Sequence, residues 1–135
     1  MKRSFHWKAG ILGSLTGGIV FGIMMAMMGM LPMIAGMVGS QSSVVGFAVH
    51  MMISFIFGLA FTLFASLFKG SALISGLIFG FGLWVLFPFI LMPMMMGMPP
   101  FPMNMDSMMS MMGHLIYGLI TGTVYGGIQK RQLAQ

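Results

Sequence analysis

Four long apolar runs, separated by short polar or proline-containing connections, make up most of the chain. They cover residues 9–30, 44–68, 71–92 and 107–128. About 20 consecutive apolar residues are enough for a helix to cross the hydrocarbon core of a bilayer, where a helix satisfies its own backbone hydrogen bonds. The pattern therefore predicts an all-α membrane protein with four transmembrane helices in a single domain of 135 residues.

The connections contain residues that typically start or bend helices. Ser42 or Ser43 is expected to cap the second helix, and Asp106 or Ser107 the fourth, because short oxygen-bearing side chains accept hydrogen bonds from the first free N–H groups. Pro88 predicts a kink near the end of the third helix, since proline has no N–H to donate.

Charged residues are rare, at 5% of the chain, whereas a soluble domain carries about 25%. A soluble fold could not solvate its surface with so few charges. The net charge of +5 does not indicate nucleic-acid binding, because the cations are too few and too scattered to form a phosphate-binding face. The sequence contains no cysteine, which excludes thiolate metal sites and disulfides.

The cations mark one side of the predicted bundle. They lie at the two ends of the chain and between the second and third runs, at Lys2, Arg3, Lys8, Lys69, Lys130 and Arg131. The other two connections contain no Lys or Arg. Because Lys and Arg accumulate in cytoplasmic connections, we expect a multi-pass protein of the cell membrane with both termini in the cytoplasm.

The two halves of the chain, residues 9–68 and 71–128, resemble each other. The matches are "MLPMIAGM" (30–37) with "LMPMMMGM" (91–98), "GGIVFG" (17–22) with "SGLIFG" (75–80), and His50 with His114. Each half starts and ends on the same side of the membrane. We therefore expect two helical hairpin repeats of parallel topology, related by an axis along the membrane normal.

Each run also carries small residues at four-residue spacing, which let helices approach closely in a bilayer. These ladders are Ser14, Gly18, Gly22 and Ala26; His50, Ser54, Gly58 and Thr62; Ala72, Gly76 and Gly80; and His114, Gly118, Gly122 and Gly126. Since both histidines lie on ladders, we expect their side chains to face protein rather than lipid.

The stretch "GHLIYGLITGTVYGG" (113–127), with its Gly-His-x-x-Tyr-Gly motif, follows a Pro- and Met-rich connection that contains "MPMMMG". In these features the chain resembles a widespread family of small bacterial and archaeal four-helix membrane proteins, known as a domain of unknown function. The resemblance covers most of the chain and implies the fold. It implies no catalytic residues.

Methionine is strongly segregated along the sequence. Apart from the first residue, every methionine lies between Met24 and Met52 or between Met92 and Met112. In the predicted topology these windows are the outer connections and the outer halves of the adjoining helices. A general preference for methionine would not respect that boundary.

Three explanations of the segregation remain open. Methionine fills irregular gaps near prolines and loops, and a Met-rich surface also adapts to a protein partner. Alternatively, thioethers and imidazoles bind monovalent copper or silver. The ligands would then be His50 and His114 at the centre, supported by Met33, Met94 and Met98.

Enzymatic activity is not expected, because acid–base and metal-assisted hydrolysis usually need carboxylates and Asp106 is the only one. Axial ligation of a haem by His50 and His114 is a minor alternative. The expected partners are the lipid bilayer and either further copies of the chain or another membrane protein. A structural or accessory subunit is thus the main competitor of the metal-binding hypothesis.

Overall fold

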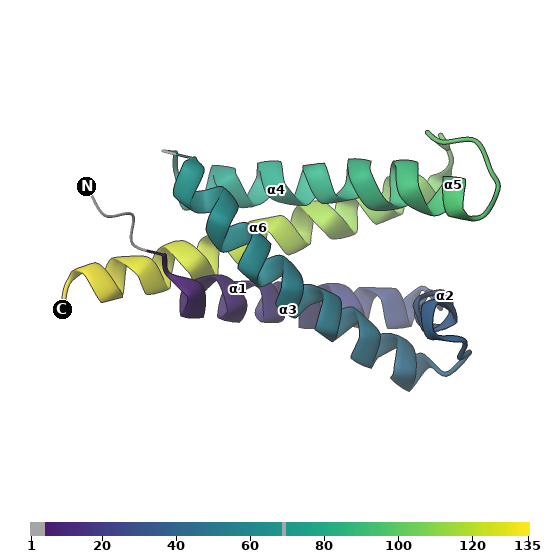
Figure 1. Cartoon of the computed structure of the whole chain (residues 1–135), viewed down its shortest axis with the longest axis horizontal. Helices are drawn as coiled ribbons and strands as arrows, with labels where there is room; N and C mark the ends of the chain where they lie inside the picture. The colour runs from purple at the N-terminus through teal and green to yellow at the C-terminus, as the bar shows by residue number, and fades with distance from the viewer. Residues whose placement is uncertain (1–4, 69) are drawn as a thin grey trace.

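The computed structural model describes residues 5–68 and 70–135, and these residues form helices and connections without a strand. The elements are α1 (Trp7–Met27), α2 (Leu31–Ala35), the 3₁₀ turn η1 (Gly36–Val38), α3 (Ser43–Leu67), α4 (Ala72–Leu86), the π-helical turn η2 (Phe87–Leu91), α5 (Met92–Met95) and α6 (Met105–Leu133) (Figure 1). The predicted cytoplasmic residues Lys2, Arg3 and Lys69 lie outside the described residues.

Three of the four predicted spans are long and apolar enough to cross a membrane. They are Trp7–Met27, Ser43–Leu67 and the continuous helix Ala72–Met95. The fourth run forms the longest helix, α6, with 29 residues. It is less apolar than the others because His114, glycines and hydroxyl residues interrupt it, so its crossing stays a prediction.

The helices do not pack in chain order. α1 lies between α3 and α6, and α6 lies between α1 and α4 (Figure 1). Both termini and the α3–α4 connection lie at one end of the bundle, whereas α2 and the connection after α5 lie at the other (Figure 1). The two Met-rich connections therefore share one end.

Close packing of α1 on its two neighbours follows from two stripes of small residues. A methyl group added at Gly18 would lie 2.8 Å from the Cβ atom of Ser54 on α3. On the other stripe, a methyl group at Gly17 would lie 2.9 Å from the carbonyl oxygen of Tyr117 on α6. Neither face of α1 has room for a larger side chain, so the glycines set both helix spacings.

The predicted small-residue ladders lie in these contacts, with one exception. His50, Ser54, Gly58 and Thr62 are all buried on α3. The prediction for Ala26 is wrong, because Ala26 is exposed and Met25 is buried instead. The ladder stops there because α1 ends one residue later, at Met27.

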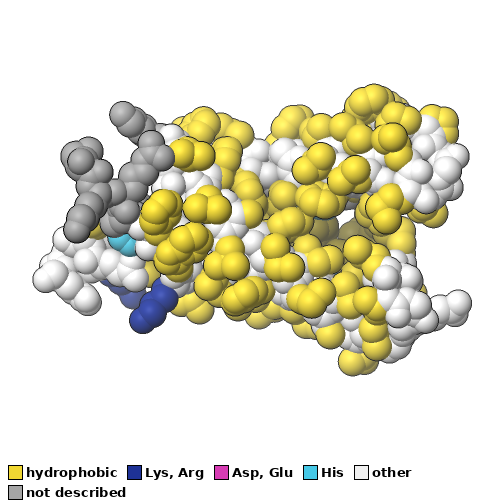
Figure 2. Space-filling view, viewed as in Figure 1, with side chains coloured by type: hydrophobic (Ala, Val, Ile, Leu, Met, Phe, Trp, Pro, Cys, Tyr) yellow, Lys and Arg dark blue, Asp and Glu magenta, His cyan; other side chains and the backbone are white. Residues whose placement is uncertain are grey.

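α3 and α4 diverge although only a short connection joins them (Figure 1). Phenylalanine rings join α3 to α4 and to the following turn η2: Phe61 lies 5.3 Å from Phe79 on α4, and Phe57 lies 5.3 Å from Phe87 at the start of η2, measured between ring centroids. Figure 2 shows a surface covered with apolar side chains and hollowed between α3 and α4, toward the end with α2 and α5.

The cap of α3 is confirmed and that of α6 is corrected. The Ser42 hydroxyl accepts from the Val45 N–H at 3.5 Å. On α6 the cap is Asn104, not Asp106 or Ser107, because the helix begins at Met105. The Asn104 Oδ1 atom accepts from the Ser107 N–H at 2.8 Å, and Asp106 lies in the first turn.

Pro88 lies in the π-helical turn η2, where the widened backbone accommodates a residue without an N–H group. The Phe89 carbonyl in this turn accepts from the Phe101 N–H at 2.8 Å. The neighbouring Trp84 indole donates to the Ser107 carbonyl at 3.0 Å. These bonds attach the α5–α6 connection to the end of α4 and fix where α6 starts.

Candidate functional site

Two histidines on different helices are held by backbone carbonyls. The Nε2–H of His50 on α3 donates to the Gly18 carbonyl at 2.8 Å, and the Nδ1–H of His114 on α6 donates to the Ser110 carbonyl at 2.8 Å. A carbonyl can only accept, so in each neutral ring the other nitrogen carries the lone pair. Those nitrogens are Nδ1 of His50 and Nε2 of His114.

Both imidazoles contact the same aromatic ring, that of Phe21 on α1. The ring centroids are 5.6 Å apart for His50 and 4.9 Å apart for His114, both in edge-on geometry. His50 is buried and His114 is partly buried. The two histidines are thus at one level of the bundle, on either side of α1, and both face protein, as the four-residue ladders predicted.

A buried junction of hydrogen bonds lies about one turn beyond His50 on α3 and His114 on α6. The Ser14 hydroxyl on α1 donates to the Ser54 carbonyl on α3. A hydroxyl has one proton, so the Tyr117 hydroxyl on α6 must be the donor in its bond with Ser14. The junction joins α1, α3 and α6 without a charged group. It thereby holds these helices in the register that brings the two histidines to one level.

At the end of the bundle a pocket of about 430 Å³ gathers sulfur and a carboxylate. It is lined by Met28, Gly29, Met30, Met33, Asp106 and Met109. We call it the methionine pocket. Its residues come from the turn after α1, from α2 and from the first turns of α6, and neither histidine lines it.

The structure therefore brings together only part of the predicted metal-binding set. It places His50 and His114 around Phe21, and it places Met33 in the methionine pocket. Met94 on α5 and Met98 in the following connection are 58% and 49% exposed and do not line that pocket.

Sequence reasoning missed the grouping of Met28, Met30 and Met109 with Asp106. Two spacings hint at it, since residues three apart share a helix face and both Met30–Met33 and Asp106–Met109 have that spacing. No pattern in the sequence, however, reports that these two segments lie side by side.

Among residues 5–68 and 70–135, no group of three or more His, Asp or Glu side chains is placed to hold an ion. The donors of the predicted metal-binding set are imidazole and methionine sulfur, which favour soft metals such as monovalent copper.

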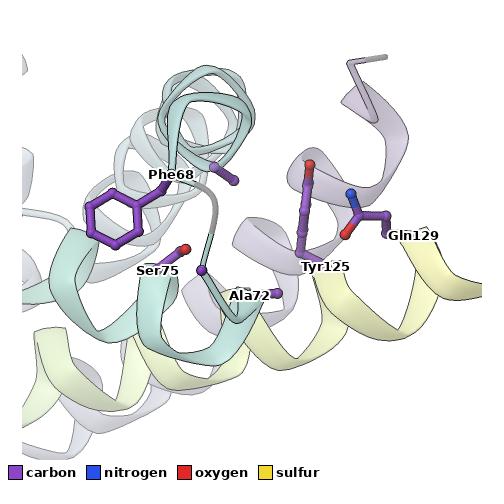
Figure 3. A pocket seen from close by; sticks show the side chains of 7 residues that line it. Phe68, Ala72, Ser75, Tyr125 and Gln129 are labelled. Atoms are coloured by element: carbon purple, nitrogen blue, oxygen red, sulfur yellow. The ribbon is translucent and has the colours of Figure 1, made fainter. Parts of the chain in front are cut away.

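A smaller pocket of about 200 Å³ lies at the opposite end of the bundle (Figure 3). Tyr125 and Gln129 project into it from α6, opposite Phe68 and Ser75 from the α3–α4 side (Figure 3). Its described lining residues carry no charge and no sulfur, so this pocket offers hydrogen bonds but no soft-metal ligands.

These features define the class: an all-helical protein with three helices apolar enough to span a membrane and with histidines between its helices. The chain belongs to the family of unknown function DUF6789, whose model matches residues 8–135. This match confirms the resemblance to an uncharacterised family. Comparisons with curated proteins and with solved structures found no match.

Proposed function

We propose that the chain is a multi-pass protein of the cell membrane with four transmembrane helices and both termini in the cytoplasm. The position of α6 between α1 and α4 supports the fourth crossing, because α6 runs alongside two helices that can span the bilayer. The cations Lys8, Lys130 and Arg131 flank the ends of α1 and α6 at the terminal end of the bundle, which supports the orientation.

Matched contacts support the proposal of two parallel hairpin repeats. Within the first hairpin, a methyl group at Gly22 would lie 3.1 Å from His50 Cδ2. Within the second, the matched Gly80 packs on the matched His114, there against the backbone carbonyl instead of the side chain. Gly18 with Ser54 and Gly76 with Gly118 form the next matched pair, so the two α1–α3 and α4–α6 pairs pack in one register.

The proposed role is binding of monovalent copper or silver near the outer leaflet, without enzymatic activity. One observation carries it: His50 and His114 contact one ring, and each uses one nitrogen to donate to a backbone carbonyl. This arrangement orients histidines in metal sites by fixing the tautomer and leaving the other nitrogen for the ion. Met33, Met94 and Met98 are the supporting ligands of the proposal.

Titration with Ag⁺ of the purified protein in detergent tests the histidine site, with calorimetry giving the number of ions bound per chain. We expect the His50→Ala/His114→Ala variant to bind one ion fewer than the unaltered chain. The matched control is His6→Ala, since His6 lies at the other end of the bundle beside Gln132. Equal binding by the double variant and the control would reject the histidine site.

A structural or accessory role is the second candidate, and the exposure of the methionines favours it. Met27, Met95 and Met103 are 83%, 79% and 79% exposed, and flexible thioethers adapt to varied protein surfaces. Replacing these three by Asn would weaken packing on a membrane partner while leaving Ag⁺ binding at the histidines intact. Cross-linking in native membranes before and after the replacement is the measurement.

The haem alternative gains no support from the geometry. The Phe21 ring contacts both imidazoles, and neither histidine lines a described pocket. A porphyrin between the two rings would need space that Phe21 occupies in part.

A further inference from the structure

We propose that the methionine pocket is a second, separate binding site for a monovalent soft metal ion at the outer surface of the bundle. The inference takes the class of ion from the proposed function, but apart from Met33 it rests on different residues. Its basis is the juxtaposition of four thioethers, from Met28, Met30, Met33 and Met109, with the carboxylate of Asp106 around one hollow.

The charge of the pocket matches a monovalent ion. Asp106 is the single acidic residue of a chain with a net charge of +5, and methionine sulfur is neutral. One carboxylate with thioethers around a monovalent ion gives a neutral assembly, which avoids the cost of an unpaired charge beside the apolar bundle. Hard divalent ions prefer six or more oxygen ligands, which this lining does not provide.

Helix capping does not account for the grouping. A carboxylate in the first turn of α6 is favoured by the helix dipole, and this explains Asp106 alone. Within the described residues the Asp106 carboxylate makes no hydrogen bond or ion pair, and Asn104 provides the cap of α6. The dipole gives no reason for four methionines from two distant segments to surround that carboxylate.

The pocket is accessible, and its sulfurs can move. Met33 and Met109 are 44% and 42% exposed, so an ion can reach them from outside the bundle. Gly29 has a φ of +68° and would have nothing within 4 Å of an added methyl group. This left-handed turn connects α1 to α2, and the residues before and after it, Met28 and Met30, both line the pocket. Three rotatable bonds let each thioether turn toward an ion.

The methionine pocket and the histidines lie at successive levels of α1. Phe21 contacts both histidines, Met25 is buried one turn later in the same core cluster, and Met28 then lines the pocket. The pocket is thus the outer of the two sites. An ion would meet the pocket before the histidines.

The test is Ag⁺ titration of the full chain in detergent, followed by calorimetry and by NMR of methionines labelled with ¹³C in the methyl group. In the unaltered chain we expect the pocket methyl signals to shift with the first equivalent of Ag⁺. Met28→Leu/Met30→Leu/Met109→Leu, which keeps Met33 because it is also a supporting ligand of the histidine site, should lose one bound ion per chain. Asp106→Asn should weaken this step by about 10-fold or more, the range seen when a supporting group of a metal site is removed.

The matched control is Met95→Leu/Met103→Leu/Met105→Leu, which replaces three exposed methionines outside the lining. Met and Leu have similar volumes, and helical circular dichroism checks that both triple variants fold. Loss of an ion in the pocket variant but not in this control supports the inference. Equal loss in both, or no loss in the pocket variant, overturns it.

The histidine variant separates the two proposals. If His50→Ala/His114→Ala keeps all its Ag⁺ while the pocket variant loses an ion, the histidine site fails and the pocket stands. If the histidine variant loses an ion while the pocket variant binds as the unaltered chain does, the pocket fails and the histidine site stands.

Discussion

Tyr117 of α6 donates its hydroxyl proton to Ser14 of α1, and Ser14 donates its own proton to the Ser54 carbonyl of α3. Ser14 and Tyr117 are 0% and 2% exposed, so neither hydroxyl can exchange its partner for water. The bond between Tyr117 and Ser14 connects the α1–α3 hairpin with the α4–α6 hairpin inside the bundle.

The direction of that bond predicts unequal effects at its two ends. Ser14→Ala removes the Ser14 acceptor of the buried Tyr117 hydroxyl, which costs about 1–3 kcal/mol, whereas Tyr117→Phe removes a donor and leaves Ser14 bonded to the Ser54 carbonyl, at about 1 kcal/mol. Unfolding in mixed detergent micelles measures both. Thr123→Val is the control, because Thr123 is exposed and bonds within its own helix. A larger loss for Tyr117→Phe would contradict the assigned direction.

Glycine at position 76 sets the distance between α4 and α6. A methyl group there would lie 2.8 Å from the Cα atom of Gly122, so Gly76→Ala should destabilise the bundle by about 1–3 kcal/mol, as overpacking does. Gly82→Ala is the matched control on the same helix, since nothing lies within 4 Å of its added methyl group. It should leave stability unchanged or raise it by up to about 1 kcal/mol. Equal effects of Gly76→Ala and Gly82→Ala on stability would show that α4 and α6 are not tightly packed at Gly76.

The start of α6 depends on Asn104 rather than on Asp106. Asn104→Ala should cost about 1 kcal/mol because the Ser107 N–H loses its acceptor, and Asn104→Asp should keep the cap. Hydrogen exchange at the first amides of α6 reports the loss directly. Faster exchange in Asp106→Ala but not in Asn104→Ala would show that Asp106, and not Asn104, caps α6.

The absence of cysteine from the sequence makes labelling of introduced cysteines a clean test of topology. We expect Gln41→Cys and Met103→Cys, both at exposed positions, to react with an impermeant maleimide from outside intact cells. Gln135→Cys, at the C-terminus, should react only after permeabilisation. Reaction of both Met103→Cys and Gln135→Cys from one side would show that α6 does not cross the membrane.

The elements of the fold were predictable from local pattern, because the length of an apolar run and the spacing of its small residues are properties of one helix. Ser42 and the burial of His50 followed from the same local rules. The partner of each small-residue stripe was not predictable: α1 carries two stripes, and only the packed bundle assigns Gly18 to α3 and Gly17 to α6.

The candidate site was likewise predictable from the sequence only in part. The shared level of His50 and His114 could be inferred from equal depth in two similar segments. The methionine pocket could not, because Met30 and Asp106 meet only when α6 packs beside the turn that follows α1. The capping residue was missed because the proline-rich segment hides where α6 begins, and Asn104 lies two residues before Asp106, the first of the expected caps.

The loose contact between α3 and α4 bears on how the protein can move. α3 meets α4 and η2 through phenylalanine rings, whereas α1 approaches the α6 backbone directly at Gly17. We therefore expect the α1–α6 seam to act as the hinge of the molecule, about which one hairpin would swing relative to the other. Such a swing would open or close the α3–α4 side laterally to lipid tails, while the seam that holds Tyr117 against Ser14 stays shut.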